Sequence, residues 1–253
     1  LYTQTDFFAG STQKKDFLGE LTNALLTRIT TDRTLSAGAL LHVMTEAIQS
    51  RDIQFYFTDE QLQSLVSQWN WSGSVDMEGD SVGLVEANLG VNKTNFFVTR
   101  EALSQITIEP DGSIEHAFTV KMSNDAPVLQ DGSGGYQNYM RILVPSGATV
   151  REVSLDGVMV PIRDITKVVP PSPPYWFVEE ANSHQVVHVP VFVAPQQTRQ
   201  LSLSWVRANA LTFDNAVAVY ELTLRKQPGV AATPWNIIVR YPPTWGSSGE
   251  GGI

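Results

Sequence analysis

The densest group of polar side chains in the sequence lies between residues 86 and 100. Its members with binding potential are three asparagines, a lysine and an arginine, namely Asn88, Asn92, Lys93, Asn95 and Arg100. Amides donate and accept hydrogen bonds, and the two cations attract acidic groups, so the cluster is a candidate site for a ligand or a partner protein. Asparagines beside a glycine also form turns, because their side chains bond to nearby backbone groups. We therefore expect first a turn that fixes strand register, and second a binding site.

Other chemistry has weaker support in the sequence. A buried Lys93 or Lys121 beside an asparagine and a carboxylate would allow an isopeptide cross-link between strands. His184 and His188 lie four residues apart and face the same side of a strand, but no third ligand stands at a spacing typical of a metal site. The acidic residues between 125 and 131 lack the ordered spacing of a calcium loop. We predict no catalytic residue, no metal site and no cofactor.

The composition is that of a folded, acidic and weakly charged protein. Of its 253 residues, 42% are hydrophobic and 17% are charged, which supplies apolar side chains for a packed core. The formal net charge of −9 disfavours nucleic acid and anionic lipid as partners, because both require basic surfaces. The absence of cysteine excludes disulfides and thiolate chemistry, and it fits an exported protein. The sequence contains no apolar run of about 20 residues, so we expect any membrane anchor to lie upstream of Leu1.

The first part of the sequence has the periodicity of amphipathic helices. In the first predicted helix, apolar residues recur at the spacing of one helix face, at Leu18, Leu21, Leu25 and Ile29. A second helix is predicted from about residue 35 to residue 50. A third is predicted after Thr58, where Gln61 completes a capping box.

From about residue 80 onward, apolar and polar residues alternate as in β-strands. The predicted strands are separated by turn sequences that contain proline or glycine, such as Pro110-Asp111-Gly112 and Asp156-Gly157. Consecutive strands joined in this way pair antiparallel. The sequence therefore predicts an α+β fold, in which an N-terminal helical segment is followed by mainly antiparallel β-structure in sandwich-like units.

A proline-rich run at residues 170–174 divides the β-rich part. It cannot continue a strand ladder, and it is either a linker between two domains or a crossover between two sheets of one sandwich. Taken as a linker, it ends an antiparallel β domain at 81–168. The predicted helices before that domain form a helical segment at 1–80, which completes a truncated α/β domain. An immunoglobulin-like sandwich of short strands then follows at 175–245, and residues 246–253 form a flexible tail.

Several short motifs in a fixed order resemble those of one bacterial protein family. They include Ala87-Asn88-Leu89-Gly90 with Asn92-Lys93, and Tyr136-Gln137-Asn138-Tyr139-Met140-Arg141 leading to Val144-Pro145-Ser146-Gly147. The likeness spans most of the chain and extends to Lys14–Leu18, Arg51–Tyr56, Trp69–Gly73 and Lys226–Gly229. The family is catalogued as domain of unknown function 4012. Arg141, which ends the second motif, joins the candidate binding residues.

The resemblance implies an extracytoplasmic protein of the bacterial cell surface. Members of the family have an N-terminal membrane anchor, a long extracytoplasmic region and no assigned activity. Their upstream half is distantly similar to the LytR-CpsA-Psr phosphotransferases, which load polymers onto the cell wall. We expect a non-enzymatic envelope protein that acts through contacts with itself or other envelope proteins, as a repeating unit of an assembly with pairable sheet edges. The alternatives are a carbohydrate- or wall-binding module and a fragment of a wall-polymer phosphotransferase.

Overall fold

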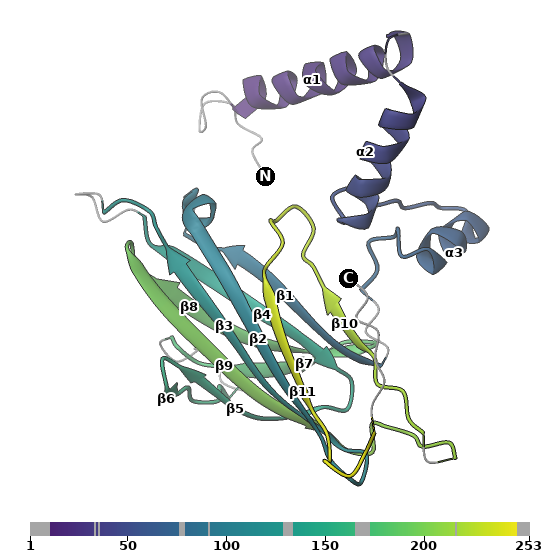
Figure 1. Cartoon of the computed structure of the whole chain (residues 1–253). Helices are drawn as coiled ribbons and strands as arrows, with labels where there is room; N and C mark the ends of the chain where they lie inside the picture. The colour runs from purple at the N-terminus through teal and green to yellow at the C-terminus, as the bar shows by residue number, and fades with distance from the viewer. Residues whose placement is uncertain are drawn as a thin grey trace. The chain divides into compact units, whose positions relative to one another are not determined.

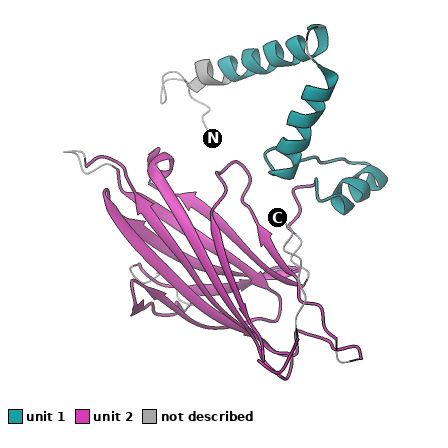
Figure 2. Ribbon diagram, viewed as in Figure 1, with its two compact units in different colours: residues 1–71 teal, residues 72–253 magenta. Residues whose placement is uncertain are grey.

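The computed structural model describes residues 11–246 apart from residues 33, 35, 76–78, 91, 129–133, 165–172 and 216, and it omits the side chains of residues 11–15. The chain forms two compact units, residues 1–71 and residues 72–253 (Figure 2). The first unit is helical, and the second consists mainly of β-strands (Figure 1). The predicted α+β class with sandwich-like β-structure is therefore confirmed.

The described part of the first unit contains the helices α1 (Ser11–Thr31), α2 (Ala37–Gln49) and α3 (Glu60–Gln68). Asp59 caps α3, because its carboxylate accepts from the amides of Gln61 and Leu62. The capping box predicted at Thr58 was therefore wrong: the helix is capped one residue later, where a carboxylate reaches two amides at once, and the third helical residue is then Leu62, which cannot bond back to the cap. None of the described helices is both long and apolar enough to cross a membrane.

The helices of the first unit bury few of their apolar side chains. In its described part, Ile48 and Val66 are the buried hydrophobic residues. The apolar side chains of α1 are exposed, among them Phe17, Leu18, Leu21, Leu25 and Leu26. Helices of this length gain most of their stability from packing rather than from propensity. The first unit therefore has only a small core of its own.

The described part of the second unit forms two sheets. The first sheet has the order β10-β1-β4-β8-β7, with strands Leu222–Arg225, Asp80–Asn88, Tyr136–Pro145, His184–Val193 and Phe177–Glu180. The second sheet has the order β11-β2-β3-β9-β5-β6, with strands Trp235–Arg240, Val98–Ile108, Ile114–Asn124, Gln197–Arg207, Thr149–Leu155 and Val158–Met159. A short 3-10 helix, η1 (Thr94–Phe97), precedes β2.

Neighbouring strands pair antiparallel except at one end of each sheet. β10 pairs parallel with β1, and β11 pairs parallel with β2. The remaining pairings are antiparallel, as the turn sequences predicted. β10 and β11 are the last of the described strands and lie beside β1 and β2, which are the first, so both sheets are mixed.

The two sheets share one main core. In β3 the even-numbered residues from Ile114 to Asn124 are buried, and the odd-numbered residues between them are not. The same core contains Val82 of β1, Ile142 of β4, Val189 of β8 and Leu203 of β9. A smaller cluster forms around Ile106, Ile108 and Ile114. Apolar faces of both sheets thus meet as in a β-sandwich.

The predicted division of the β-rich part into two domains was wrong. β4 pairs with β8 and β3 pairs with β9, so strands from 81–168 and from 175–245 lie side by side in both sheets. Neither segment supplies two complete sheets, and each buries its apolar face only with strands from the other. The proline-rich run connects β6 of the second sheet to β7 of the first, so the crossover interpretation holds. Residues 170–172 of that run and 247–253 of the predicted tail lie outside the described residues.

Candidate functional site

Asn88 and Asn92 form the hydrogen-bonded turn that the sequence predicted. Nδ2 of Asn88 donates to Oδ1 of Asn92 at 2.8 Å, and Oδ1 of Asn88 accepts from the amide of Gly90 at 2.9 Å. Oδ1 of Asn92 also accepts from the Thr94 amide at 3.1 Å, while its Nδ2 donates to the Gly135 carbonyl at 3.0 Å. Because these donors and acceptors satisfy one another, the turn holds the end of β1 beside the start of β4.

Lys93 and Asn95 do not take part in this network. Both residues are exposed, and their side chains have no hydrogen bond or ion pair with another described residue. Lys121 is also exposed, with Nζ 3.9 Å from a carboxylate oxygen of Glu101. An isopeptide cross-link requires a buried lysine beside an asparagine. The exposure of Lys93 and Lys121 therefore argues against the cross-link that their sequence positions would have allowed.

Arg100 lies in a buried polar cluster between the two sheets. Its guanidinium forms an ion pair with the carboxylate of Glu86 and donates to Tyr136 Oη at 3.3 Å, and Asn138 Nδ2 donates to Glu86 Oε1 at 2.7 Å. Burial raises the pKa of Glu86, since desolvation of the carboxylate outweighs the attraction of Arg100. Burial also raises the pKa of Tyr136 to about 12. The cluster satisfies its own charge, so Arg100 joins the two sheets and has little freedom to bind a ligand.

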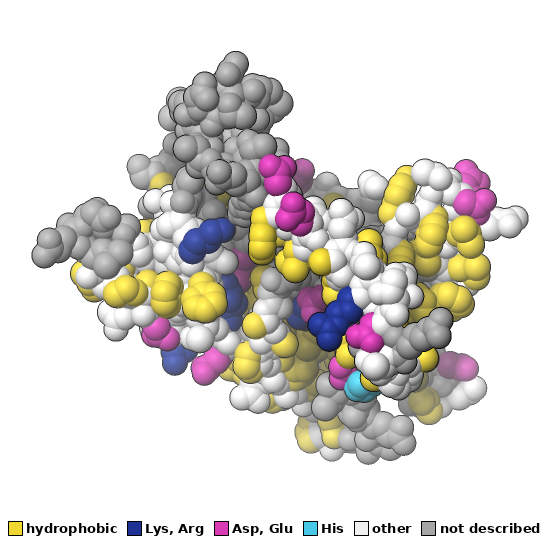
Figure 3. All heavy atoms as spheres, turned by 90° about the horizontal axis from the view of Figure 1, so that it is seen from above, with side chains coloured by type: hydrophobic (Ala, Val, Ile, Leu, Met, Phe, Trp, Pro, Cys, Tyr) yellow, Lys and Arg dark blue, Asp and Glu magenta, His cyan; other side chains and the backbone are white. Residues whose placement is uncertain are grey.

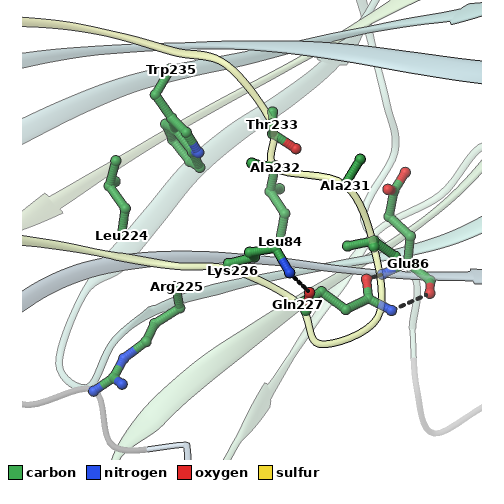
Figure 4. Close-up of a pocket in the computed structure, with 11 residues that line it drawn as sticks. Leu84, Glu86, Leu224, Arg225, Lys226, Gln227, Ala231, Ala232, Thr233 and Trp235 are labelled. Atoms are coloured by element: carbon green, nitrogen blue, oxygen red, sulfur yellow. Dashed lines mark hydrogen bonds between the residues drawn. The ribbon is translucent and has the colours of Figure 1, made fainter. Parts of the chain in front are cut away.

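A small apolar pocket lies beside Glu86, where the loop between β10 and β11 closes one side of the sandwich (Figure 4). Its volume is about 180 Å³, and its lining includes Leu84, Leu224, Ala231, Ala232 and Trp235. The side chain of Gln227 fixes the loop by accepting from the Glu86 amide and donating to the Glu86 carbonyl. Figure 4 shows the guanidinium of Arg225 pointing away from the pocket. A pocket of this size and lining suits one apolar side chain rather than a whole small-molecule substrate.

Arg141 lies on the outer face of the first sheet, apart from the asparagine turn. It pairs with His188 of β8, which in turn pairs with Phe177 of β7. The His188 ring stacks on Phe177 with centroids 4.4 Å apart, and its nitrogens lie 3.1 Å from Tyr139 Oη and 3.0 Å from a Glu179 carboxylate oxygen. Burial lowers the pKa of His188, against the opposing effect of Glu179. The predicted binding residues thus lie in separate places and do not form one site.

The predicted pairing of His184 and His188 on one face of β8 does not extend to a metal centre. Among the residues that the structure describes, no three His, Asp or Glu side chains lie close enough together to hold a metal ion. Residues 129–131 of the acidic loop lie outside the described part of the chain.

A second buried polar cluster, at the start of β1, was missed by the sequence analysis. Nε2 of His116 lies 2.9 Å from Oδ2 of Asp80, and the Tyr220 hydroxyl donates to the same oxygen at 2.5 Å. The His116 ring stacks on Trp205 with centroids 4.4 Å apart. Desolvation and the nearby Asp80 carboxylate raise the pKa of Tyr220. The sequence indicates this cluster only through His116, a histidine at a core-facing position of a strand. Asp80 and Tyr220 come from distant segments, so spacing does not connect them to it.

The strand β11 is an open edge of the second sheet. Its residues Ile237, Ile238 and Val239 are 44%, 40% and 40% exposed. On the face of the molecule drawn in Figure 3, hydrophobic side chains are likewise exposed between polar and charged ones. An exposed apolar edge strand offers unpaired backbone groups and side chains to another chain.

Comparisons with known proteins assign no family to the chain. No protein-family model and no curated protein sequence matches it. Among solved structures, it is similar to the M1 zinc metallopeptidase from Deinococcus radiodurans, with 16% identity, a TM-score of 0.25, and coverage of 44% of this chain and 20% of that one. It is also similar to leukotriene A4 hydrolase from Saccharomyces cerevisiae, with 12% identity, a TM-score of 0.28, and coverage of 56% and 18%. The chain spans about a fifth of the length of these proteins, and likenesses of this size carry no function over to it.

Proposed function

We propose that this protein is a non-enzymatic component of the bacterial cell surface that acts through protein–protein contacts, first of all with copies of itself. The observation that carries the proposal is the open apolar edge at β11. The location at the cell surface is supported by the motifs that resemble the domain of unknown function 4012 family. That family has an extracytoplasmic region and no assigned activity.

β11 lacks the features by which sheet edges usually avoid pairing with other chains. Short strands, charged side chains and prolines protect an edge. β11 has six residues, and Arg240 is its one charged residue. The other edges are shorter: β6 has two residues, β10 has four, and β7 has four of which two are Glu179 and Glu180. Of these edges, β11 is therefore the least protected against pairing with a strand of another chain.

A second copy of the chain fits this edge by symmetry. In an antiparallel pair of β11 strands centred on Ile238, that residue faces its own copy, and Ile237 faces Val239 of the other copy. Asn236 then stands opposite Arg240 of the other copy, so no two like charges meet. Ile237 and Val239 are in register with buried residues of β2, so pairing would bury them between the joined sandwiches. We expect the complete interface to exceed about 1,000 Å².

Analytical ultracentrifugation of the full chain tests this contact. We expect the wild-type chain to form dimers as its concentration rises. Ile238→Lys should stay monomeric over the same range, because two lysines would face each other across the two-fold axis. Val158→Lys is the matched control, since Val158 is 70% exposed at the β6 edge of the same sheet, and it should associate as the wild type does. A wild-type monomer at every concentration, or equal loss in both variants, would contradict the proposal.

The cellular location requires a separate experiment. Intact bacteria that carry the full-length protein are treated with a protease that does not cross the membrane. We expect the protein to be degraded in intact cells. Protection from the protease until the cells are lysed would exclude the surface location without bearing on self-association.

A further inference from the structure

Two arginines on the outer face of the first sheet lack an anionic partner. The guanidiniums of Arg141 and Arg163 form no hydrogen bond and no ion pair with another described residue, although both residues are partly buried. In this acidic chain, Arg100, Arg151 and Arg199 each pair with a carboxylate. A partly buried charge without a counter-ion costs free energy, which an anion bound at this face would offset.

Arg163 is fixed beside β7 by its backbone and by two aromatic rings. Its amide donates to the Trp176 carbonyl at 2.7 Å. Its Cζ atom lies 5.3 Å from the ring centroid of Tyr175 and 5.4 Å from that of Phe177. These rings attract the face of the guanidinium, but they accept none of the hydrogen bonds that its N–H groups donate in the guanidinium plane. Those donors therefore remain available to a ligand.

Arg141 lies at the other end of a row of side chains that crosses β4, β8 and β7. It is in register with His188, and the His188 ring stacks on Phe177, over which Arg163 lies. Burial raises the pKa of Tyr139, and the positive charges of both arginines oppose that rise, because both lie near its hydroxyl group. The two cations thus flank one small surface.

We propose that Arg141 and Arg163 together bind a phosphate group of a ligand. At pH 7 a phosphate monoester carries a charge of about −1.5 to −2, which matches two guanidiniums, and its oxygens accept hydrogen bonds from both. A carboxylate carries one charge and would leave one arginine unpaired. Glu179, the acidic residue that contacts the row, lies 3.0 Å from His188 and forms no ion pair with either arginine. The site is on the first sheet, whereas the proposed self-association uses β11 of the second.

Titration of the full, isotope-labelled chain with inorganic phosphate at constant ionic strength, followed by nuclear magnetic resonance, tests the proposal. We expect saturable shifts at the amides around Arg141 and His188, with a dissociation constant on the order of 1 mM. Arg141→Gln and Arg163→Gln should each weaken binding about tenfold, because each removes a charged donor. Arg151→Gln is the matched control: it removes the same charge from the second sheet, where Arg151 already pairs with Glu115, so it should bind phosphate as the wild type does.

Thermal unfolding shows whether the variants keep the fold. Arg141→Gln breaks no hydrogen bond or ion pair between described side chains, so without phosphate it should melt no lower than the wild type. Phosphate should raise the melting temperature of the wild type but not that of this variant. If one of the two variants unfolds, the other decides.

Acetate serves as the rival probe, because it offers a carboxylate in place of a phosphate. The proposal is overturned if phosphate gives no saturable shifts, or if acetate binds as tightly as phosphate. It is also overturned if a folded Arg141→Gln or Arg163→Gln binds phosphate as tightly as Arg151→Gln does.

Discussion

Glu86 and Asn88 occupy successive core-facing positions of β1 and stabilise the protein in different ways. Asn88 closes a turn with neutral hydrogen bonds, whereas Glu86 brings a charge between the sheets that Arg100 compensates. Loss of Arg100 leaves the buried Glu86 carboxylate without its cation, and loss of Asn88 leaves the half-buried Gly90 amide without its side-chain acceptor. That penalty is larger than the net contribution of the original bond.

Asn88→Ala tests the structural role of the turn. The change removes the donor to Asn92 and the acceptor for the Gly90 amide, so we expect a loss of about 1–3 kcal/mol in the free energy of unfolding. Chemical denaturation of the purified chain measures it. Asn95→Ala is the control, because Asn95 is exposed, and it should leave stability unchanged. Equal stability of the two variants would show that the turn is not structural.

His188 should make stability depend on pH. Burial lowers the pKa of His188 below its ordinary value of 6.5, so the folded state binds the proton less readily than the unfolded state. Its contribution to stability is therefore present above the unfolded pKa and is lost as pH falls through the folded pKa. We expect the melting temperature of the wild type to fall more steeply from about pH 7 to about pH 5 than that of His188→Gln.

The matched control is His42→Gln, because the side chain of His42 is 73% exposed on α2. This variant should follow the wild type across the pH range. If the melting temperatures of the wild type and His188→Gln fall equally steeply with pH, His188 does not cause the loss of stability in acid.

The sequence predicted those side-chain contacts that are local. Asn88 and Asn92 stand four residues apart, and turn chemistry alone indicates how they bond. His116 and Tyr220 lie 36 and 140 residues from Asp80, so only the pairing of strands brings the three together. Residue spacing therefore indicated the turn but not the buried Asp80 cluster.

The positions of strands and helices in the sequence were easier to predict than which strands pair with each other. The alternation predicted from about residue 80 onward is present in β3 and β8, because each of these strands buries one face. Parallel partners for β1 and β2 were not predicted, since β10 and β11 follow them by more than a hundred residues. Pattern along the chain determines which residues face the core, but not which strand lies alongside.

The cap of α3 supports a prediction at this scale. Asp59→Ala removes the acceptor for the amides of Gln61 and Leu62, and we expect it to destabilise the first turn by about 1 kcal/mol. Hydrogen exchange at these two amides should become faster in the full chain. Thr58→Ala provides the comparison and should leave exchange unchanged. Faster exchange in the Thr58 variant alone would restore the capping box predicted from the sequence.

At the scale of the whole molecule, the two units differ in how much they bury. The main core contains residues from β1 to β5 and from β8 and β9 of the second unit, while the described helices bury little. We expect residues 72–253, expressed alone, to unfold in one cooperative transition. Its melting temperature should equal that at which the β-rich unit unfolds in the full chain. Residues 81–168 alone should stay unfolded, because β8 and β9 are missing. A folded 81–168 fragment would reinstate the two-domain division.

The parallel pairings also affect how a newly synthesised chain reaches this fold. Asp80 pairs with Leu222 and Ala102 with Trp235, so the outer neighbours of β1 and β2 leave the ribosome more than a hundred residues after these strands. Closing such long segments costs entropy before the pairing offsets it, which makes completion of the sheets late and slow. During that interval the apolar strands of a nascent chain remain accessible to chaperones and to other unfinished copies.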